Sequence, residues 1–342
     1  MPLVTIELHI ADTLLAGKNI VVHIDGDKIN TSVESTKPAA GNGGTMFLEF
    51  FKQYISQITG AKSVRTLETY RYARSRFRAF LDNGDVSLKD VNEQLISRYE
   101  QHLRKDGLTM NTISFHLRIL RTAYNKAVEA GMVSDARPFR HAYTKVEKTP
   151  KRAITIESIR SIKDYQAKED EVRFSQDMFL FSFYTQGMSF VDMAYLKPAN
   201  IKDGWLTYQR KKTGQTIRLR WAQCMQEIVD KYYQPTQPFL LPIIHSANGK
   251  ERNQYRGKQM RVNRGLKVMA TDIHLDRNLT MYVARHSWAS IAEAMGLPIN
   301  LISIGLGHSS EKTTQIYLKS LRTDQIDRTN QHIISLLSAD TR

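Results

Sequence analysis

The sequence predicts a mainly α-helical protein of two domains that also contains one small antiparallel β-sheet. Through residues 45–132 and most of the chain after residue 153, apolar side chains recur at spacings of three and four, the period of a helix with one buried face. The segment GWLTYQRKKTGQTIRLRW has two alternating runs on either side of Thr213-Gly214, which is the pattern of a β-hairpin. With 342 residues, 41% of them hydrophobic, the chain is long enough for two domains that each bury a core.

Composition and charge narrow the class of protein. No apolar run approaches the roughly 18–20 residues that a membrane-spanning helix needs, and the N-terminus lacks the pattern of a secretory signal, so we expect a cytoplasmic protein without a membrane partner. Cys224 is the only cysteine, which excludes an intrachain disulfide framework and a cysteine-based zinc site. Lys and Arg total 49 against 34 Asp and Glu, a net charge of +15, and this excess favours a polyanionic partner such as nucleic acid. A basic surface that serves only solubility is the alternative.

Two segments lie outside the expected domains. Residues 1–34 have the pattern of short strands around Asp25-Gly26-Asp27, and residues 37–44 have the Pro, Ala, Gly and Asn content of a linker. Residues 135–152 combine two prolines with many basic side chains and no apolar period, which indicates a linker whose charge suits a phosphate backbone. The expected segments are a strand-rich arm with its linker, a helical domain, a basic linker and a second domain: residues 1–44, 45–134, 135–152 and 153–342.

The helical domain has arginine-rich polar faces. Four helices are expected, of which the second places arginines opposite an apolar stripe that includes Leu67 and Phe77. The fourth helix repeats this arrangement. Taken singly, each arginine is more often an ordinary solvated side chain than a DNA contact. The residues expected to bind DNA, with one from the basic linker, are Arg71, Arg74, Arg118, Arg121 and Arg152.

The second domain is expected to be helical on both sides of its hairpin. Before the hairpin, helices are expected at residues 178–187 and 190–197. A further helix at residues 324–338 has an apolar stripe that could pack within the chain or against a second copy. The helices between them are expected to start near Gln223, Asn253, Met281, Asn300 and Ser310.

Four residues of the second domain suit phosphoryl transfer at a phosphodiester. Arg285 lies near a helix start, His308 precedes Tyr317 by nine residues, and Lys212 lies beside the hairpin turn. The transition state of such a transfer carries more negative charge than the substrate, so fixed cationic donors stabilise it selectively. A tyrosine phenol has an ordinary pKa near 10 and needs cationic neighbours or a base to act as a nucleophile. A lysine on a hairpin can protonate the leaving oxygen.

These segments resemble the tyrosine recombinase (phage-type integrase) family. LGHSSEKTTQIYLK resembles its signature of Leu-Gly-His and a catalytic tyrosine nine residues after the histidine. AYLKPANI, the hairpin with Lys-Thr-Gly, and ARHSWA follow the order and spacing of its catalytic domain. GMSFVDMAYL and YVARHSWA are most similar to integrases of Bacteroides-type mobile elements. The resemblance covers residues 45–325 and implies a SAM-like core-binding domain followed by a mostly helical catalytic domain.

The resemblance also implies an activity and roles for the four residues. Tyr317 would form a 3′-phosphotyrosine and Arg285 would clamp the scissile phosphate. His308 would hydrogen-bond this phosphate, and Lys212, preferred to Lys211 because it directly precedes Thr213-Gly214, would act as general acid. The chain would be a site-specific recombinase that resolves a Holliday junction as a homotetramer on paired sites in double-stranded DNA. The resemblance also implies accessory DNA-bending proteins as possible partners. No metal or nucleotide cofactor is expected, because the phosphotyrosyl bond stores the energy of the broken phosphodiester.

The sequence departs from the family pattern at three positions. The first catalytic arginine is replaced by Ser189, and Gln186 stands where some relatives supply a substitute arginine. The loss of one preorganised donor can slow a reaction by roughly 10²-fold or more. Tyr282 replaces the histidine three residues before Arg285, and its hydroxyl can still donate to a phosphate.

These departures leave two alternatives open. The chain could be a recombinase-derived DNA-binding protein that no longer cleaves, or a relaxing enzyme similar to type IB topoisomerases, which share the chemistry. Residue by residue, structural readings also compete: Tyr317 taken alone is more often a packing residue, and His308 alone could cap a helix. The joint occurrence of Tyr317, His308 and Arg285 in the family's order is what favours the enzyme.

Overall fold

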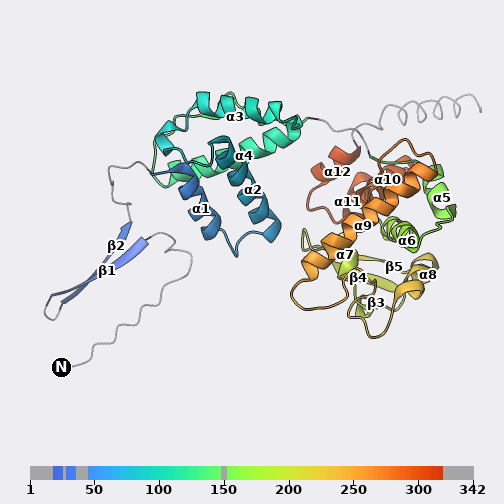
Figure 1. Ribbon diagram of the computed structural model, residues 1–342. Coiled ribbons are helices and arrows are strands. Elements are labelled where there is room, and N and C mark those ends of the chain that lie inside the picture. The colour runs from blue at the N-terminus through green and yellow to red at the C-terminus, as the bar shows by residue number, and fades with distance from the viewer. Residues whose placement is uncertain (1–17, 26–27, 36–44, 148–151, 319–342) are drawn as a thin grey trace, which may run out of the picture. The chain divides into compact units, whose positions relative to one another are not determined.

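The computed structural model describes residues 18–25, 28–35, 45–147 and 152–318, without the side chains of residues 18–35 and 316–318. The chain divides into two compact units, Met1–Thr149 and Pro150–Arg342, which are called the N-terminal and C-terminal units below (Figure 1). In the described part of the chain, no helix is both long and apolar enough to cross a membrane.

The N-terminal unit begins with an antiparallel hairpin of β1 (Lys18–Asp25) and β2 (Lys28–Ser35), within the segment where the sequence predicts short strands. Side-chain caps start two of the helices that follow: the Ser63 hydroxyl accepts a hydrogen bond from the Thr66 amide, and the Asn92 side chain accepts one from the Leu95 amide. The helical elements, including one 3-10 turn, are α1 (Phe47–Gln57), α2 (Val64–Phe80), η1 (Leu88–Asp90), α3 (Glu93–Lys105) and α4 (Met110–Glu129).

Aromatic side chains form much of the core of this helical bundle. Phe77 of α2 is fully buried and packs edge-on against Tyr99 of α3, with ring centroids 4.8 Å apart, and against Phe47 of α1. Tyr124 of α4 is buried in the same cluster. The apolar stripes of the four helices therefore meet in one core, and most of their arginines remain on the outer faces.

The C-terminal unit surrounds a helix that is buried along most of its length. Figure 1 shows α6 among the other helices of this unit, and it packs against α9 and α10. A Cβ on Gly265 of α9 would lie 2.4 Å from the Ser175 hydroxyl of α6, so only glycine permits this approach. The helical elements are α5 (Ile156–Asp164), α6 (Asp170–Tyr184), α7 (Phe190–Ala194), η2 (Pro198–Asn200), α8 (Gln223–Tyr232), α9 (Glu251–Asp272), α10 (Met281–Ala294), α11 (Ile299–Gly305) and α12 (Glu311–Leu318).

A three-stranded antiparallel sheet completes this unit in the order β3 (Ile201–Lys202), β4 (Trp205–Gln209) and β5 (Thr216–Arg220). β4 and β5 pair in register from Trp205 opposite Arg220 to Gln209 opposite Thr216. The expected hairpin and the expected fold class, mainly α with a small antiparallel sheet, are both confirmed. The helix expected at residues 324–338 lies outside the described residues.

Candidate active site

Arg285 is the centre of the site. It lies in the second turn of α10 and is only 4% exposed. One terminal nitrogen donates to the Gly187 carbonyl at 2.8 Å, and the other donates to the Leu306 carbonyl at 2.5 Å and contacts His308 Nε2 at 3.0 Å. A Cβ on Gly187 would lie 2.7 Å from the Arg285 Cα, so the glycine that follows α6 makes room for the arginine backbone.

His308 follows α11 and bridges Arg285 to α12. Its Nδ1 lies 2.8 Å from the Thr314 hydroxyl. An arginine nitrogen can only donate, so Nε2 of His308 accepts from Arg285 and Nδ1 carries the proton that is donated to Thr314. Burial, followed by the positive charges of Arg285, Arg210 and Lys212, lowers the pKa of His308 from its ordinary 6.5 to about 4. The imidazole is therefore neutral at pH 7.

The β4–β5 hairpin is docked on the segment that carries His308. Arg210 and Thr213 both donate to the Gly307 carbonyl, at 2.6 and 3.2 Å, and the Gln215 amide donates to the His308 carbonyl at 3.1 Å. Lys212 is exposed at the turn, and its charge contributes to the low pKa of His308. The structure therefore brings Lys212, His308 and Arg285 together.

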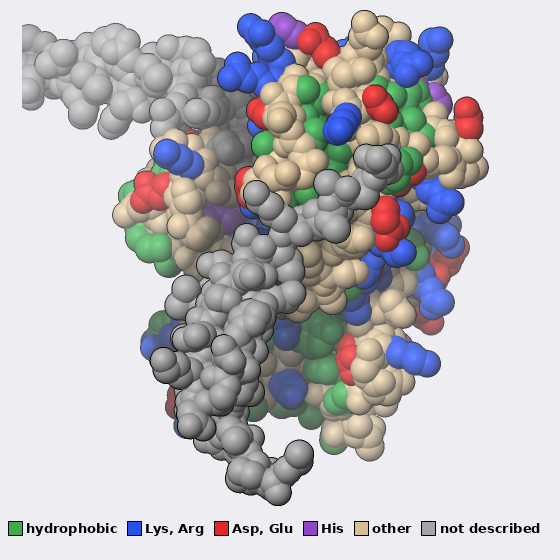
Figure 2. All heavy atoms as spheres, turned by 90° about the vertical axis from the view of Figure 1, so that its left-hand side faces the viewer, with side chains coloured by type: hydrophobic (Ala, Val, Ile, Leu, Met, Phe, Trp, Pro, Cys, Tyr) green, Lys and Arg blue, Asp and Glu red, His purple; other side chains and the backbone are tan. Residues whose placement is uncertain are grey.

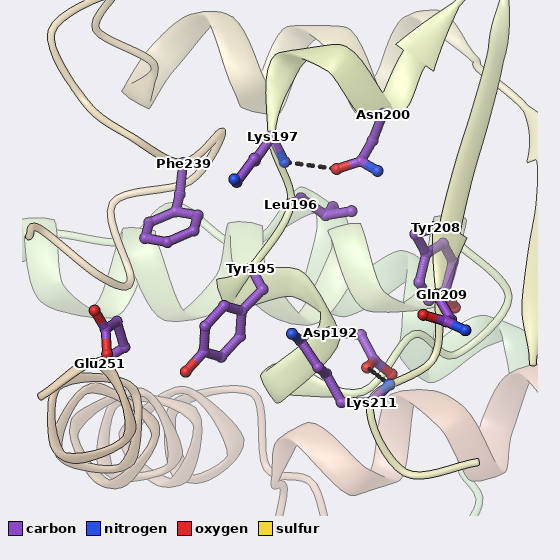
Figure 3. Close-up of a pocket in the computed structure, with 10 residues that line it drawn as sticks. All are labelled: Asp192, Tyr195, Leu196, Lys197, Asn200, Tyr208, Gln209, Lys211, Phe239 and Glu251. Atoms are coloured by element: carbon purple, nitrogen blue, oxygen red, sulfur yellow. Dashed lines mark hydrogen bonds between the residues drawn. The ribbon is translucent and has the colours of Figure 1, made fainter. Parts of the chain in front are cut away.

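The adjacent Lys211 is directed elsewhere. Its ammonium nitrogen lies 4.3 Å from the centre of the Tyr195 ring, a cation–π contact. Figure 3 shows Lys211 beside Tyr195 in a hollow that is also lined by Asp192, Phe239 and Glu251. Of the two hairpin lysines, Lys212 is thus the one whose charge acts on His308.

The departures from the family pattern have clear structural roles. The Ser189 hydroxyl donates to one oxygen of the buried Asp192 carboxylate at 2.6 Å, and the other oxygen accepts from the Lys211 amide at 2.8 Å. Gln186 has a left-handed backbone with φ of 60° directly before Gly187. Neither residue brings a positive charge to Arg285. Tyr282 is 44% exposed on α10, and its ring packs edge-on against His286 with centroids 4.4 Å apart.

Tyr317 lies in α12, three residues after Thr314, and α12 packs against α10 and α11. Its backbone is therefore in the helix that also holds the hydrogen-bond partner of His308. The side chain of Tyr317 lies outside the described part of the structure.

The arginines expected to bind DNA differ in their surroundings. Arg71 on α2 and Arg118 and Arg121 on α4 are exposed, whereas Arg74 is partly buried and donates through Nε to the Leu48 carbonyl at 2.8 Å. Arg152 is exposed in the C-terminal unit. The pKa of His286 is lowered to about 4, mainly by burial of the ring and next by the positive charge of Arg152. Figure 2 shows one face of the molecule, where Lys and Arg side chains are spread among acidic and apolar ones.

One residue of the site was missed by the sequence analysis. Arg210, just after β4, is 7% exposed, and its positive charge helps to lower the pKa of His308. The alternation of β4 places it on the same side as the buried Leu206 and Tyr208, so an arginine at a core-facing position was the available signal.

Comparisons with known proteins agree with this architecture. The model of the phage integrase SAM-like domain matches residues 46–146. Tyrosine recombinase XerD of Rhizobium meliloti (strain 1021) is 25% identical over 313 residues, which are 84% of this chain and 94% of the relative. An integrase of the transposon Tn1549, solved with circular intermediate DNA, has a TM-score of 0.65 at 15% identity and covers 84% of this chain and 100% of its own. A lambda integrase tetramer solved on a Holliday junction has a TM-score of 0.63 at 17% identity, with 83% and 82% covered.

Proposed function

We propose, from the premise that this chain is a member of the tyrosine recombinase (phage integrase) family, that it cleaves and rejoins DNA at specific sites through a 3′-phosphotyrosine and a Holliday junction. The observation that carries the proposal is the buried contact of Arg285 with His308, on which the hairpin of Lys212 is docked. Three elements distant in sequence thereby place cationic and hydrogen-bonding groups around one point, beside the helix that contains Tyr317.

Each residue then has a separate task in strand cleavage. The Tyr317 hydroxyl releases its proton to solvent as its oxygen attacks the scissile phosphorus. The bond from phosphorus to the 5′-oxygen breaks, and Lys212 gives a proton to that leaving oxygen. Arg285 donates to the non-bridging oxygens, whose charge grows in the transition state. Rejoining reverses these steps, with the 5′-hydroxyl of the partner strand attacking the phosphotyrosine.

The contacts of Arg285 in the free protein indicate how it can accept a phosphate. Its terminal nitrogens are held by two backbone carbonyls and the neutral His308 ring, which are uncharged acceptors. A phosphate oxygen is a charged acceptor and forms stronger hydrogen bonds with a guanidinium group. The carbonyls therefore hold the side chain in place without competing strongly with the substrate.

The assembly and the biological setting belong to the same proposal. A homotetramer on paired duplex sites is supported by the likeness to the lambda integrase tetramer solved on a Holliday junction. Accessory DNA-bending proteins as partners and a cytoplasmic location are further parts of this proposal. A role in a mobile element is supported by the likeness to the transposon integrase, and a Bacteroides-type element by the wording of residues 187–196. In this proposal the helical residues 45–134 contact DNA, and residues 153–342 catalyse the reaction.

A nicked suicide substrate tests the activity. A nick close to the crossover lets the cleaved fragment diffuse away, so the covalent adduct accumulates. The wild-type chain should form a denaturation-resistant adduct with a cognate element end, and Tyr317→Phe, which removes one oxygen, should bind equally and form none. A wild-type chain that binds this DNA without forming an adduct would contradict the proposal and favour the cleavage-deficient DNA-binding alternative, which the uncharged Ser189 and Gln186 motivate.

A further inference from the structure

Position 189 holds a serine where the family pattern has an arginine, but the hairpin supplies another arginine, Arg210, close to His308. We propose that Arg210 contacts the scissile phosphate in place of the missing arginine and is a catalytic residue of this chain. This inference rests on the proposed recombinase function and extends it to a residue outside the four whose roles the resemblance implies.

The surroundings of Arg210 are unusual for an arginine with only a structural role. It is 7% exposed, and its Nε is buried without a hydrogen-bond partner. Among the described residues, its side chain donates one hydrogen bond, from Nη1 to the Gly307 carbonyl, and forms no ion pair with a carboxylate. Burying a guanidinium charge without a counter-charge is costly, so a structural arginine is normally paired. An anion that binds beside Arg210 would supply the missing partner.

Arg210 and Arg285 converge on neighbouring peptide groups. Arg285 donates to the Leu306 carbonyl and Arg210 donates to the next carbonyl, that of Gly307. Both charges act on His308, which follows directly in the chain. The two guanidinium groups thus approach His308 from different elements, α10 and the end of β4, as two donors to one phosphate would.

A glycine makes room for Arg210, as another does for Arg285. Gly307 has φ of 60°, and a Cβ on it would lie 3.1 Å from Cδ of Arg210 and 2.7 Å from Cδ1 of Ile217. A side chain at this position would push the hairpin away from His308. The close packing of the hairpin, and with it the placement of Arg210, therefore depends on this glycine.

Ser189 contributes indirectly to the same arrangement. Its hydroxyl holds Asp192, and Asp192 accepts a hydrogen bond from the amide of Lys211, the residue after Arg210. Ser189 is not an arginine, but through Asp192 it helps to fix the backbone next to Arg210. In the reaction Arg210 transfers no proton: it donates hydrogen bonds to the non-bridging oxygens while the bond to Tyr317 forms and the bond to the 5′-oxygen breaks.

The test compares a charged with a neutral scissile linkage. Adduct formation is measured for wild type, Arg210→Ala and Arg210→Lys on a nicked substrate with an ordinary phosphodiester, and on one whose scissile group is a methylphosphonate, which lacks the negative charge. On the phosphodiester, Arg210→Ala should be slower than wild type by roughly 10²-fold or more, with Arg210→Lys between them. On the neutral linkage the defect of Arg210→Ala should shrink to below about 10-fold, since less charge needs stabilisation.

Controls separate this role from a structural one. For each variant, the adduct rate on one linkage is divided by its rate on the other. A loss of folded protein lowers both rates equally and so cancels in this ratio. Adding Ser189→Arg to Arg210→Ala should restore part of the rate, and Arg218→Ala, which removes an exposed arginine stacked on Trp205, should leave it unchanged. An equal defect of Arg210→Ala on both linkages would overturn the inference and leave the recombinase function standing. Absence of any wild-type adduct would overturn the function and the role of Arg210 together.

Discussion

Gly187→Ala should damage both the stability and the chemistry of the site, because this residue packs directly against the backbone of Arg285. The added Cβ would lie 2.7, 2.8 and 2.9 Å from Cα, Cγ and Cβ of Arg285, closer than such atoms approach. The backbone φ of +76° adds strain for alanine, about 1–2 kcal/mol. Overpacking a rigid site costs a further 1–3 kcal/mol or so. We therefore expect the free energy of unfolding to fall by about 2–5 kcal/mol, measured by urea denaturation.

A second glycine isolates the steric part of this effect. Gly249 has a similar φ of +81°, but a Cβ on it would meet nothing within 4 Å, so Gly249→Ala should cost only the backbone strain, about 1–2 kcal/mol. Gly187→Ala should also form the covalent adduct at least about 10-fold more slowly, since a displaced Arg285 stabilises the transition state less well. If both variants lose the same stability and both keep the wild-type adduct rate, the close approach of Gly187 and Arg285 has no functional role.

Three further outcomes follow from the site and the helical domain. Thr314→Val removes the acceptor of the His308 Nδ1 proton, so the free energy of unfolding should fall by about 1–3 kcal/mol and the adduct should form more slowly. An unchanged stability and adduct rate would mean that this hydrogen bond does not orient the ring. The folded-state pKa of His308 of about 4 lies below its ordinary value of 6.5, so its contribution to stability is present above pH 6.5 and is lost as pH falls toward 4. Stability curves of wild type and His308→Asn should therefore converge over this window, and parallel curves would refute the low pKa. Arg118→Ala should reduce the slope of log binding constant against log salt concentration by about one unit and leave the stability unchanged. Arg74→Ala should reduce this slope too and should also destabilise the fold, because it loses the hydrogen bond to α1. Unchanged salt slopes for both variants would mean that DNA binds to another face.

Local signals in the sequence were sufficient for the hairpin and for most helix starts. The Thr213-Gly214 turn between alternating runs gave β4 and β5, and the five helix starts expected after the hairpin lie within two residues of those observed. The helix α5 was not predicted, although its three isoleucines recur every third residue and the Thr155 hydroxyl caps it by accepting from the Ser158 amide. α6 begins at Asp170, eight residues before the expected start, because the apolar run marked only its second half.

The arrangement of the site depended on contacts that no sequence spacing specifies. The motif named Arg285 and His308, but their mutual hydrogen bond and the resulting tautomer follow from the packing of α10 against the segment after α11. Arg210 was overlooked because an arginine between polar hairpin residues looks solvated until Gly307 is found against it. Arg74, expected on a DNA-facing surface, also has a bond within the fold that only the neighbouring helix reveals.

The identity of the residue that becomes joined to DNA decides whether Tyr317 is the nucleophile of strand cleavage. The adduct formed on a nicked element end would be digested with protease, and the peptide that carries the nucleotide would be sequenced by mass spectrometry. Cleavage by Tyr317 should give a peptide with Tyr317 linked to a 3′-phosphate, and this species should be absent in Tyr317→Phe. A 5′-linkage, attachment to a different residue, or site-specific binding without any attached peptide would contradict it.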